Sequence, residues 1–203
     1  MKPTMPSSIQ ISDYQELINS LNSAIFGDSI HESSMEDYFI PVNLKGTTTT
    51  SIDDKVKTSE LFLKENYQKR LIQLIYQDTF YPDEINDTIS FVGKLKDAYG
   101  NTIMTNWFAG LYNEYVGDSI VLKGLLYIIL YYSDCFGDLL ELTSQAAIVN
   151  RSKEINELGV RILESQCNLK HYKILCNLKD MEPWLQNYID KVKSDFKREL
   201  CLT

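Results

Sequence analysis

The chain has 203 residues, of which 44% are hydrophobic and 24% charged, so it is long enough to bury a core without disulfide or metal crosslinks. Its formal net charge of −8 disfavours a nucleic-acid partner, because binding phosphates requires clustered lysine and arginine. The first residues lack the apolar run of a secretory signal, and the longest apolar stretch, Leu125 to Tyr132, is far shorter than the roughly 20 residues of a membrane span. We therefore expect a cytoplasmic protein that does not enter the membrane.

The first 54 residues show the least regular pattern. Residues 1–11 are predicted to form a loose arm, and a capping-box sequence at Ser12 predicts a helix that ends at Gly27. No helical period persists over residues 28–54, which we interpret as an irregular segment with room for a short extended stretch at residues 38–42.

From Thr58 onward the apolar residues recur at helical spacing. A single stripe from Leu63 to Ile75 predicts one helix, and Tyr81-Pro82-Asp83 predicts a break with a new N-cap. The next helix is predicted to carry Ile85 on its apolar face and to stop at Gly100. Another helix follows and ends at Gly117.

The second half of the chain is also predicted to be helical throughout. Asp118 or Ser119 caps a segment, residues 120–132, that is apolar nearly all round and should therefore lie at the centre of the core. Further helices are predicted at residues 136–148, 152–163, 169–178 and 183–200. The expected fold is all-α, a single helical domain over residues 1–203, with antiparallel hairpins packed as an irregular bundle or a short HEAT-like α-solenoid.

The sequence contains no recognisable catalytic, metal-binding or cofactor-binding motif. There are two histidines, and we expect His171 at the surface or at a helix end. The four cysteines form no CxxC pair and are expected to be reduced, buried thiols. We expect no cofactor, no metal and no enzymatic activity. An enzyme that uses carboxylates, with the help of His171, is the less favoured alternative.

Acidic residues are concentrated in residues 76–141, which contain ten acidic and three basic residues. The spacing of Asp134, Asp138 and Glu141 predicts one helical face, either a solvated surface or a protein-binding one. Trp107 would anchor an interface if it were exposed, whereas the tyrosines at positions 127, 131 and 132 are expected in the core. The predicted partner-binding residues are Asp83, Glu84, Asp87, Trp107, Glu114, Asp118, Asp134, Asp138 and Glu141.

The C-terminal residues carry a family resemblance. The stretch Gly159 to Leu200, with Arg161-Ile162-Leu163-Glu164, Leu175-x-x-Leu178 and Pro183-Trp184-Leu185-Gln186-x-Tyr188, resembles the last hairpins of small bacterial HEAT-like proteins, some of which are similar to immunity partners of secreted toxins. The resemblance covers about 40 of the 203 residues and implies a scaffold with variable binding surfaces and no catalytic residues. With the acidic charge it favours an immunity or inhibitor protein that occludes a basic toxin, with a helical adaptor as the alternative.

Overall fold

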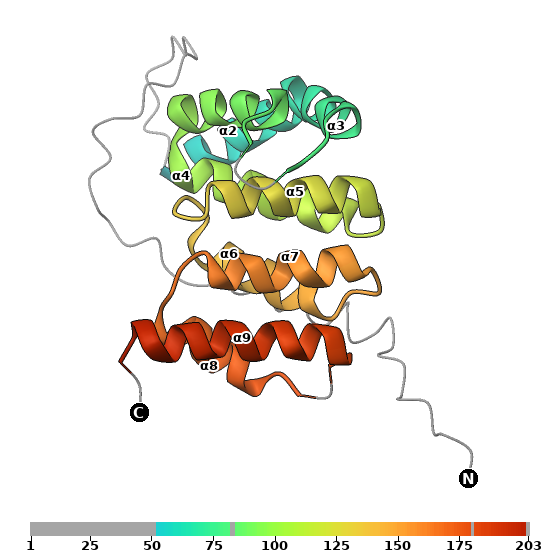
Figure 1. The fold of residues 1–203 in the computed structure, drawn as a ribbon. Coiled ribbons are helices and arrows are strands. Elements are labelled where there is room, and N and C mark those ends of the chain that lie inside the picture. The colour runs from blue at the N-terminus through green and yellow to red at the C-terminus, as the bar shows by residue number, and fades with distance from the viewer. Residues whose placement is uncertain (1–51, 82–83, 180, 202–203) are drawn as a thin grey trace, which may run out of the picture. The chain divides into compact units, whose positions relative to one another are not determined.

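The computed structural model describes residues 52–81, 84–179 and 181–201, all within the second of the two units, residues 1–32 and 33–203, into which the chain divides. These residues form eight helices and no strand, which confirms the all-α prediction (Figure 1). The predicted arm, the helix from Ser12 and residues 28–51 lie outside the described residues. None of the described helices combines the length and hydropathy of a bilayer-spanning helix. The helices are α2 (Ile52–Asn66), α3 (Gln68–Gln77), α4 (Asp87–Tyr115), α5 (Ser119–Tyr131), α6 (Gly137–Ile148), α7 (Lys153–Glu164), α8 (Leu169–Asn177) and α9 (Pro183–Glu199).

The helices of the second unit stack in the order of the chain. In the first layers α4 packs on α2 and α3, and α5 packs on α3 and α4. Helix α7 then contacts both α5 and α6, and α9 contacts both α7 and α8, as Figure 1 shows. Gly100 has a φ of 76° and divides α4 into two halves, because a residue in this conformation cannot continue an α-helix. The predicted stop at Gly100 is therefore confirmed.

The core is centred on α5. Leu125, Leu126, Ile128 and Ile129 are completely buried, as expected for a helix that is apolar nearly all round. A second cluster of buried residues joins the last four helices, and it consists of Ile148, Val160, Leu163, Leu175, Leu185, Ile189, Val192 and Phe196. Because α7 contributes to this cluster and also packs on α5, it links the first layers to the last.

Several helix boundaries differ from those predicted. Helix α2 begins at Ile52, six residues before the predicted start, because a helix can continue beyond its apolar stripe. The stripe from Leu63 to Ile75 belongs to two helices that meet at Tyr67. The cap of α4 is Asn86, whose side chain accepts a hydrogen bond from the Ile89 N–H, so Ile85 precedes the helix and is 67% exposed. Asp83, the predicted cap, lies outside the described residues.

The predicted burial of the cysteines is confirmed for one residue of four. All four thiols are free, but only Cys135 is buried, whereas Cys167 is partly exposed and Cys176 and Cys201 are exposed. Burial raises the pKa of the Cys135 thiol to about 11, so this side chain behaves as a small apolar residue. The prediction fails for Cys176 because helical spacing does not show which face of the short helix α8 is covered, and for Cys201 because this residue follows the end of α9.

Candidate functional site

The predicted acidic residues lie near both ends of α5. Asp118 caps the start of α5, a helix of 13 residues and thus about 20 Å long. Glu84 and Asp87 are exposed just before and at the start of α4, which lies beside the C-terminal end of α5, where the Tyr132 hydroxyl donates to the Ile89 carbonyl. Asp134 and Asp138 follow this C-terminal end in the chain. The structure therefore does not gather these carboxylates into one surface.

Two of the predicted acidic residues hold neighbouring helices together. The Glu114 carboxylate at the end of α4 accepts hydrogen bonds from Lys64 Nζ at 3.1 Å and from Gln68 Nε2 at 2.8 Å. The Asp118 carboxylate accepts hydrogen bonds from the N–H groups of Ile120 and Val121 and from the Tyr76 hydroxyl. Both carboxylates therefore have partners within the protein.

Asp118 also gives a testable dependence of stability on pH. Hydrogen bonds from the Tyr76 hydroxyl and the Val121 N–H hold the pKa of Asp118 below its ordinary value of 3.8. A lowered folded-state pKa contributes stability that is present above the unfolded-state pKa and is lost as the pH falls through the folded-state value. We expect Asp118→Ala to lower the free energy of unfolding by about 1 kcal/mol at neutral pH. In urea unfolding this difference should shrink below pH 3.8, and an equal difference at pH 7 and pH 3 would contradict the assignment.

The three acidic residues near α6 do not share one exposed face. Asp134 precedes the helix and is exposed, because α6 begins only at Gly137. The Glu141 side chain is 15% exposed and lies 2.5 Å from Lys170 Nζ, which is also 3.6 Å from Asp138 Oδ1. The single-face prediction is therefore wrong for Asp134, and the charge of Glu141 is balanced by α8.

Trp107 is not a surface anchor. Its side chain is 4% exposed and packs edge-on against Phe108, with ring centroids 5.6 Å apart. Helix α4 contacts α2, α3, α5 and α6, and Phe108 is completely buried, so both aromatic residues belong to the core. The prediction of Trp107 as a binding residue is corrected accordingly.

His171 lies at a helix end, one of the two positions expected for it, but its side chain is buried and does not lie at the surface. It lies in the first turn of α8 and is 1% exposed. Its Nδ1 lies 3.0 Å from the Leu163 carbonyl and 2.9 Å from the Gln166 carbonyl, and its Nε2 lies 3.4 Å from Glu141. Since carbonyl oxygens only accept, Nδ1 carries the proton and donates it. The imidazole therefore joins α8 to the end of α7 and to α6.

The described residues form two hollows elsewhere, along the outer side of α5. The two hollows adjoin at Phe80, with volumes of about 570 Å³ and about 280 Å³, and we call them together the α5 groove. The larger hollow is lined by Phe80, Tyr81, Glu84, Ile89, Tyr127, Leu130, Tyr131, Arg161, Glu164, Ser165, Tyr188 and Lys191. The smaller is lined by Ile75, Asp78, Thr79, Phe80, Ser119, Ile120, Lys123, Ser152, Glu154 and Ile155. Of the predicted binding residues that the structure describes, only Glu84 lines the groove.

One face of α5 forms the floor of both hollows. Ile120 and Lys123 line the smaller hollow, and Tyr127, Leu130 and Tyr131 line the larger one. These positions follow helical spacing, and the first and last are about 17 Å apart along the helix axis. Tyr127 and Tyr131 are therefore not core residues, although their neighbours in the sequence are. Because α5 is apolar nearly all round, its sequence gave no sign of which residues face outward.

The segment between α3 and α4 forms one wall, and hydrogen bonds hold it in place. Asp78 accepts hydrogen bonds from both the N–H and the hydroxyl of Thr88, each at 2.7 Å. The Phe80 ring stacks on Tyr127, with centroids 5.4 Å apart and planes inclined by 17°. The aromatic lining is thus already formed in the unbound protein.

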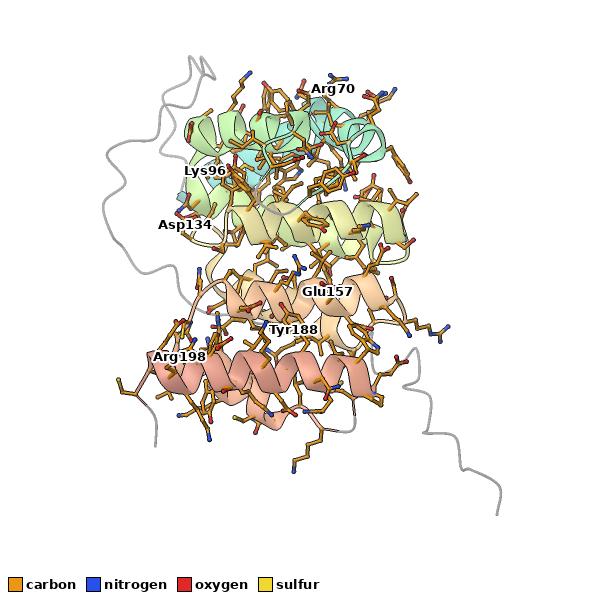
Figure 2. The ribbon with its side chains drawn as sticks, in the orientation of Figure 1. Arg70, Lys96, Asp134, Glu157, Tyr188 and Arg198 are labelled. Atoms are coloured by element: carbon orange, nitrogen blue, oxygen red, sulfur yellow. The ribbon has the colours of Figure 1, made fainter. Side chains whose placement is uncertain are left out.

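Helices α7 and α9 form the opposite wall, which is polar. Glu157 accepts two hydrogen bonds from Arg161, at 3.1 and 2.8 Å, and the Tyr188 hydroxyl donates to Glu164. Burial, followed by the bond to Glu164, raises the pKa of Tyr188, so its hydroxyl stays protonated as a donor. Figure 2 shows Glu157 and Tyr188 where α7 and α9 face each other.

The chemistry of the α5 groove suits binding through rings, hydrogen bonds and charge. Aromatic rings provide large contact areas at low entropic cost, and phenol groups add polar contacts. Among the residues that the structure describes, no group of three or more histidine, cysteine, aspartate or glutamate side chains is arranged to hold a metal ion.

Comparison with protein-family models, with curated proteins and with solved structures finds no match to this chain.

Proposed function

We propose that this chain is a non-catalytic protein-binding protein, and that the α5 groove holds an extended segment of its partner. The observation that carries the proposal is the alignment of two hollows along one face of α5. The floor extends about 17 Å. This is the length of about five residues of extended chain.

The exposed rings of the groove supply the binding energy. Tyr81 is 58% exposed and Tyr131 is 40% exposed, and both line the larger hollow. Tyrosine is among the residues that dominate protein interfaces, because burying its ring removes a large apolar area from water. Two such residues beside a preformed hollow indicate that this surface binds a protein, and that it is not simply a face exposed to solvent.

Two forms of this function are each supported by a different observation. An adaptor that holds a peptide segment is supported by the length of the groove. An immunity or inhibitor protein that occludes a basic toxin is supported by the net charge of −8, which favours and accelerates encounter with a basic partner. The inhibitor form predicts that a stoichiometric amount of the chain abolishes the partner's activity, whereas the adaptor form predicts that this activity persists in the complex.

The proposal is tested by measuring whether partner binding depends on the groove. The full chain is used to capture its partner, and the affinity is then measured for Tyr81→Ser and Tyr131→Ser. We expect each substitution to weaken binding about 10-fold, because each removes an aromatic contact worth more than about 1 kcal/mol.

Leu61→Ser is the matched control, since Leu61 is 55% exposed on α2 and does not line either hollow. It should leave the affinity unchanged. Binding that survives both tyrosine substitutions, or that is lost with Leu61→Ser, would contradict the proposed site.

A further inference from the structure

One exposed ring of the larger hollow, Tyr131, lies next to a tyrosine whose ring already contacts a lysine of the same chain. Lys96 Nζ lies 5.6 Å from the ring centroid of Tyr132, within the range of a cation–π contact. The adjacent Tyr131 ring packs edge-on against Tyr132, with centroids 4.9 Å apart, and remains partly exposed in the larger hollow. Tyr131 therefore offers a partner the kind of ring that the protein itself uses to hold an ammonium group.

The charges of the larger hollow favour a cation over an anion. Arg161 is neutralised by Glu157, with which it forms two hydrogen bonds. Glu164 accepts a hydrogen bond from the Tyr188 hydroxyl. The carboxylate of Glu84 is exposed and forms no ion pair with any described residue. The lining itself holds two carboxylates, Glu84 and Glu164, and two cations, Arg161 and Lys191. Because Arg161 is paired with Glu157, which lies outside the lining, the two carboxylates face Lys191 as the one cation of the lining without an ion-pair partner among the described residues.

We propose that the α5 groove takes a basic partner segment, and that an arginine or lysine of this segment lies in the larger hollow against Tyr81 and Tyr131, with its charge paired to Glu84. This inference rests on the proposed function and specifies the chemistry of the partner. The two tyrosine rings contact the aliphatic part of the arginine or lysine side chain and its charged group, and Glu84 accepts a charge-assisted hydrogen bond from that group. Lys191, which lines the same hollow, opposes the cation and weakens its binding.

The test uses three synthetic peptides of about eight residues and the full chain. One peptide carries arginine at alternate positions among glycine and serine, the second carries neutral, nearly isosteric citrulline in place of arginine, and the third carries glutamate. We expect the arginine peptide to bind about 10-fold more tightly than the citrulline peptide in calorimetric titration at low salt, and the glutamate peptide to bind most weakly.

Variants assign the effect to the named residues. Glu84→Gln should weaken binding of the arginine peptide about 5-fold and leave the citrulline peptide unchanged, because it removes only the charge. Lys191→Gln should strengthen binding of the arginine peptide about 2-fold. Glu65→Gln is the matched control, since it removes an exposed negative charge on α2 away from the groove. The affinities for the arginine and citrulline peptides should change by no more than the loss of one unit of net charge causes.

The outcomes separate this inference from the proposed function. Equal binding of the arginine and citrulline peptides, with both lost in Tyr131→Ser, overturns the cation preference and leaves the groove as a protein-binding site. The inference is also overturned if the glutamate peptide binds best, if Glu65→Gln acts as strongly as Glu84→Gln, or if no peptide binds in a Tyr131-dependent manner. Only in the last case, and if partner capture is also insensitive to Tyr81→Ser and Tyr131→Ser, does the proposed function fail as well.

Discussion

Replacing Gly159 with alanine is expected to lower the free energy of unfolding by about 3 kcal/mol, because the added methyl group meets backbone atoms that cannot move aside. A Cβ atom at this position would lie 2.7 Å from the Ser144 carbonyl oxygen and 2.8 Å from both the Ile148 nitrogen and Ile148 Cγ1. Helices α6 and α7 can approach this closely only because residue 159 has no side chain. Urea unfolding followed by circular dichroism measures the change directly.

Gly110→Ala is the matched control for this substitution. Gly110 is an exposed residue of α4, and a Cβ atom there meets nothing within 4 Å. Because alanine has the higher helix propensity, the control should raise the free energy of unfolding by up to about 1 kcal/mol. A Gly159→Ala variant as stable as the wild type would contradict the close packing of α6 on α7 at this residue.

Replacing His171 with alanine is expected to cost about 3 kcal/mol of stability. The substitution leaves the carbonyls of Leu163 and Gln166 without their donor and opens a cavity beneath α8. The buried position of His171 also gives a prediction that differs from that of the carboxylate-dependent enzyme.

In our account the residue positions α8 against α6 and α7. Its replacement therefore affects folding, and affects function only through folding.

His171→Asn separates the two contributions of the imidazole. The asparagine amide places a donor near the position of Nδ1 and keeps the bonds to the two carbonyls, but it fills less of the cavity and does not reach Glu141. We expect a loss about half that of His171→Ala, measured by the same unfolding experiment. Equal losses for the two variants would show that the hydrogen bonds contribute nothing.

The helices were predictable because their apolar residues repeat at regular spacing and their ends carry recognisable signals. Asp118 caps α5, Gly100 divides α4 and Pro183 begins α9, as the sequence indicated. The division between α2 and α3 at Tyr67 was not predictable in this way, because the apolar stripe continues across it. Periodicity identifies the faces of helices, but not the turns between helices that share a face.

The candidate site was largely missed because it depends on which helices become neighbours. The lining of the larger hollow comes from the segment after α3, from the start of α4 and from α5, α7 and α9, which are far apart in the sequence. Tyr127 and Tyr131 lie in the most apolar helix, and this sequence context predicts core positions for both. The clustering of acidic residues in the sequence was real, but Glu114, Asp118 and Glu141 have partners within the protein that only tertiary packing reveals.

The central claim, that the outer face of α5 is the protein-binding surface, is tested most directly by photo-crosslinking in cells. A benzoylphenylalanine residue is introduced at Tyr131 in one full-length variant and at Leu61 in another, and the crosslinked products are identified by mass spectrometry. The account predicts a discrete protein adduct from position 131 and none from position 61. Adducts of equal yield from both positions, or a protein adduct from position 61 alone, would contradict it.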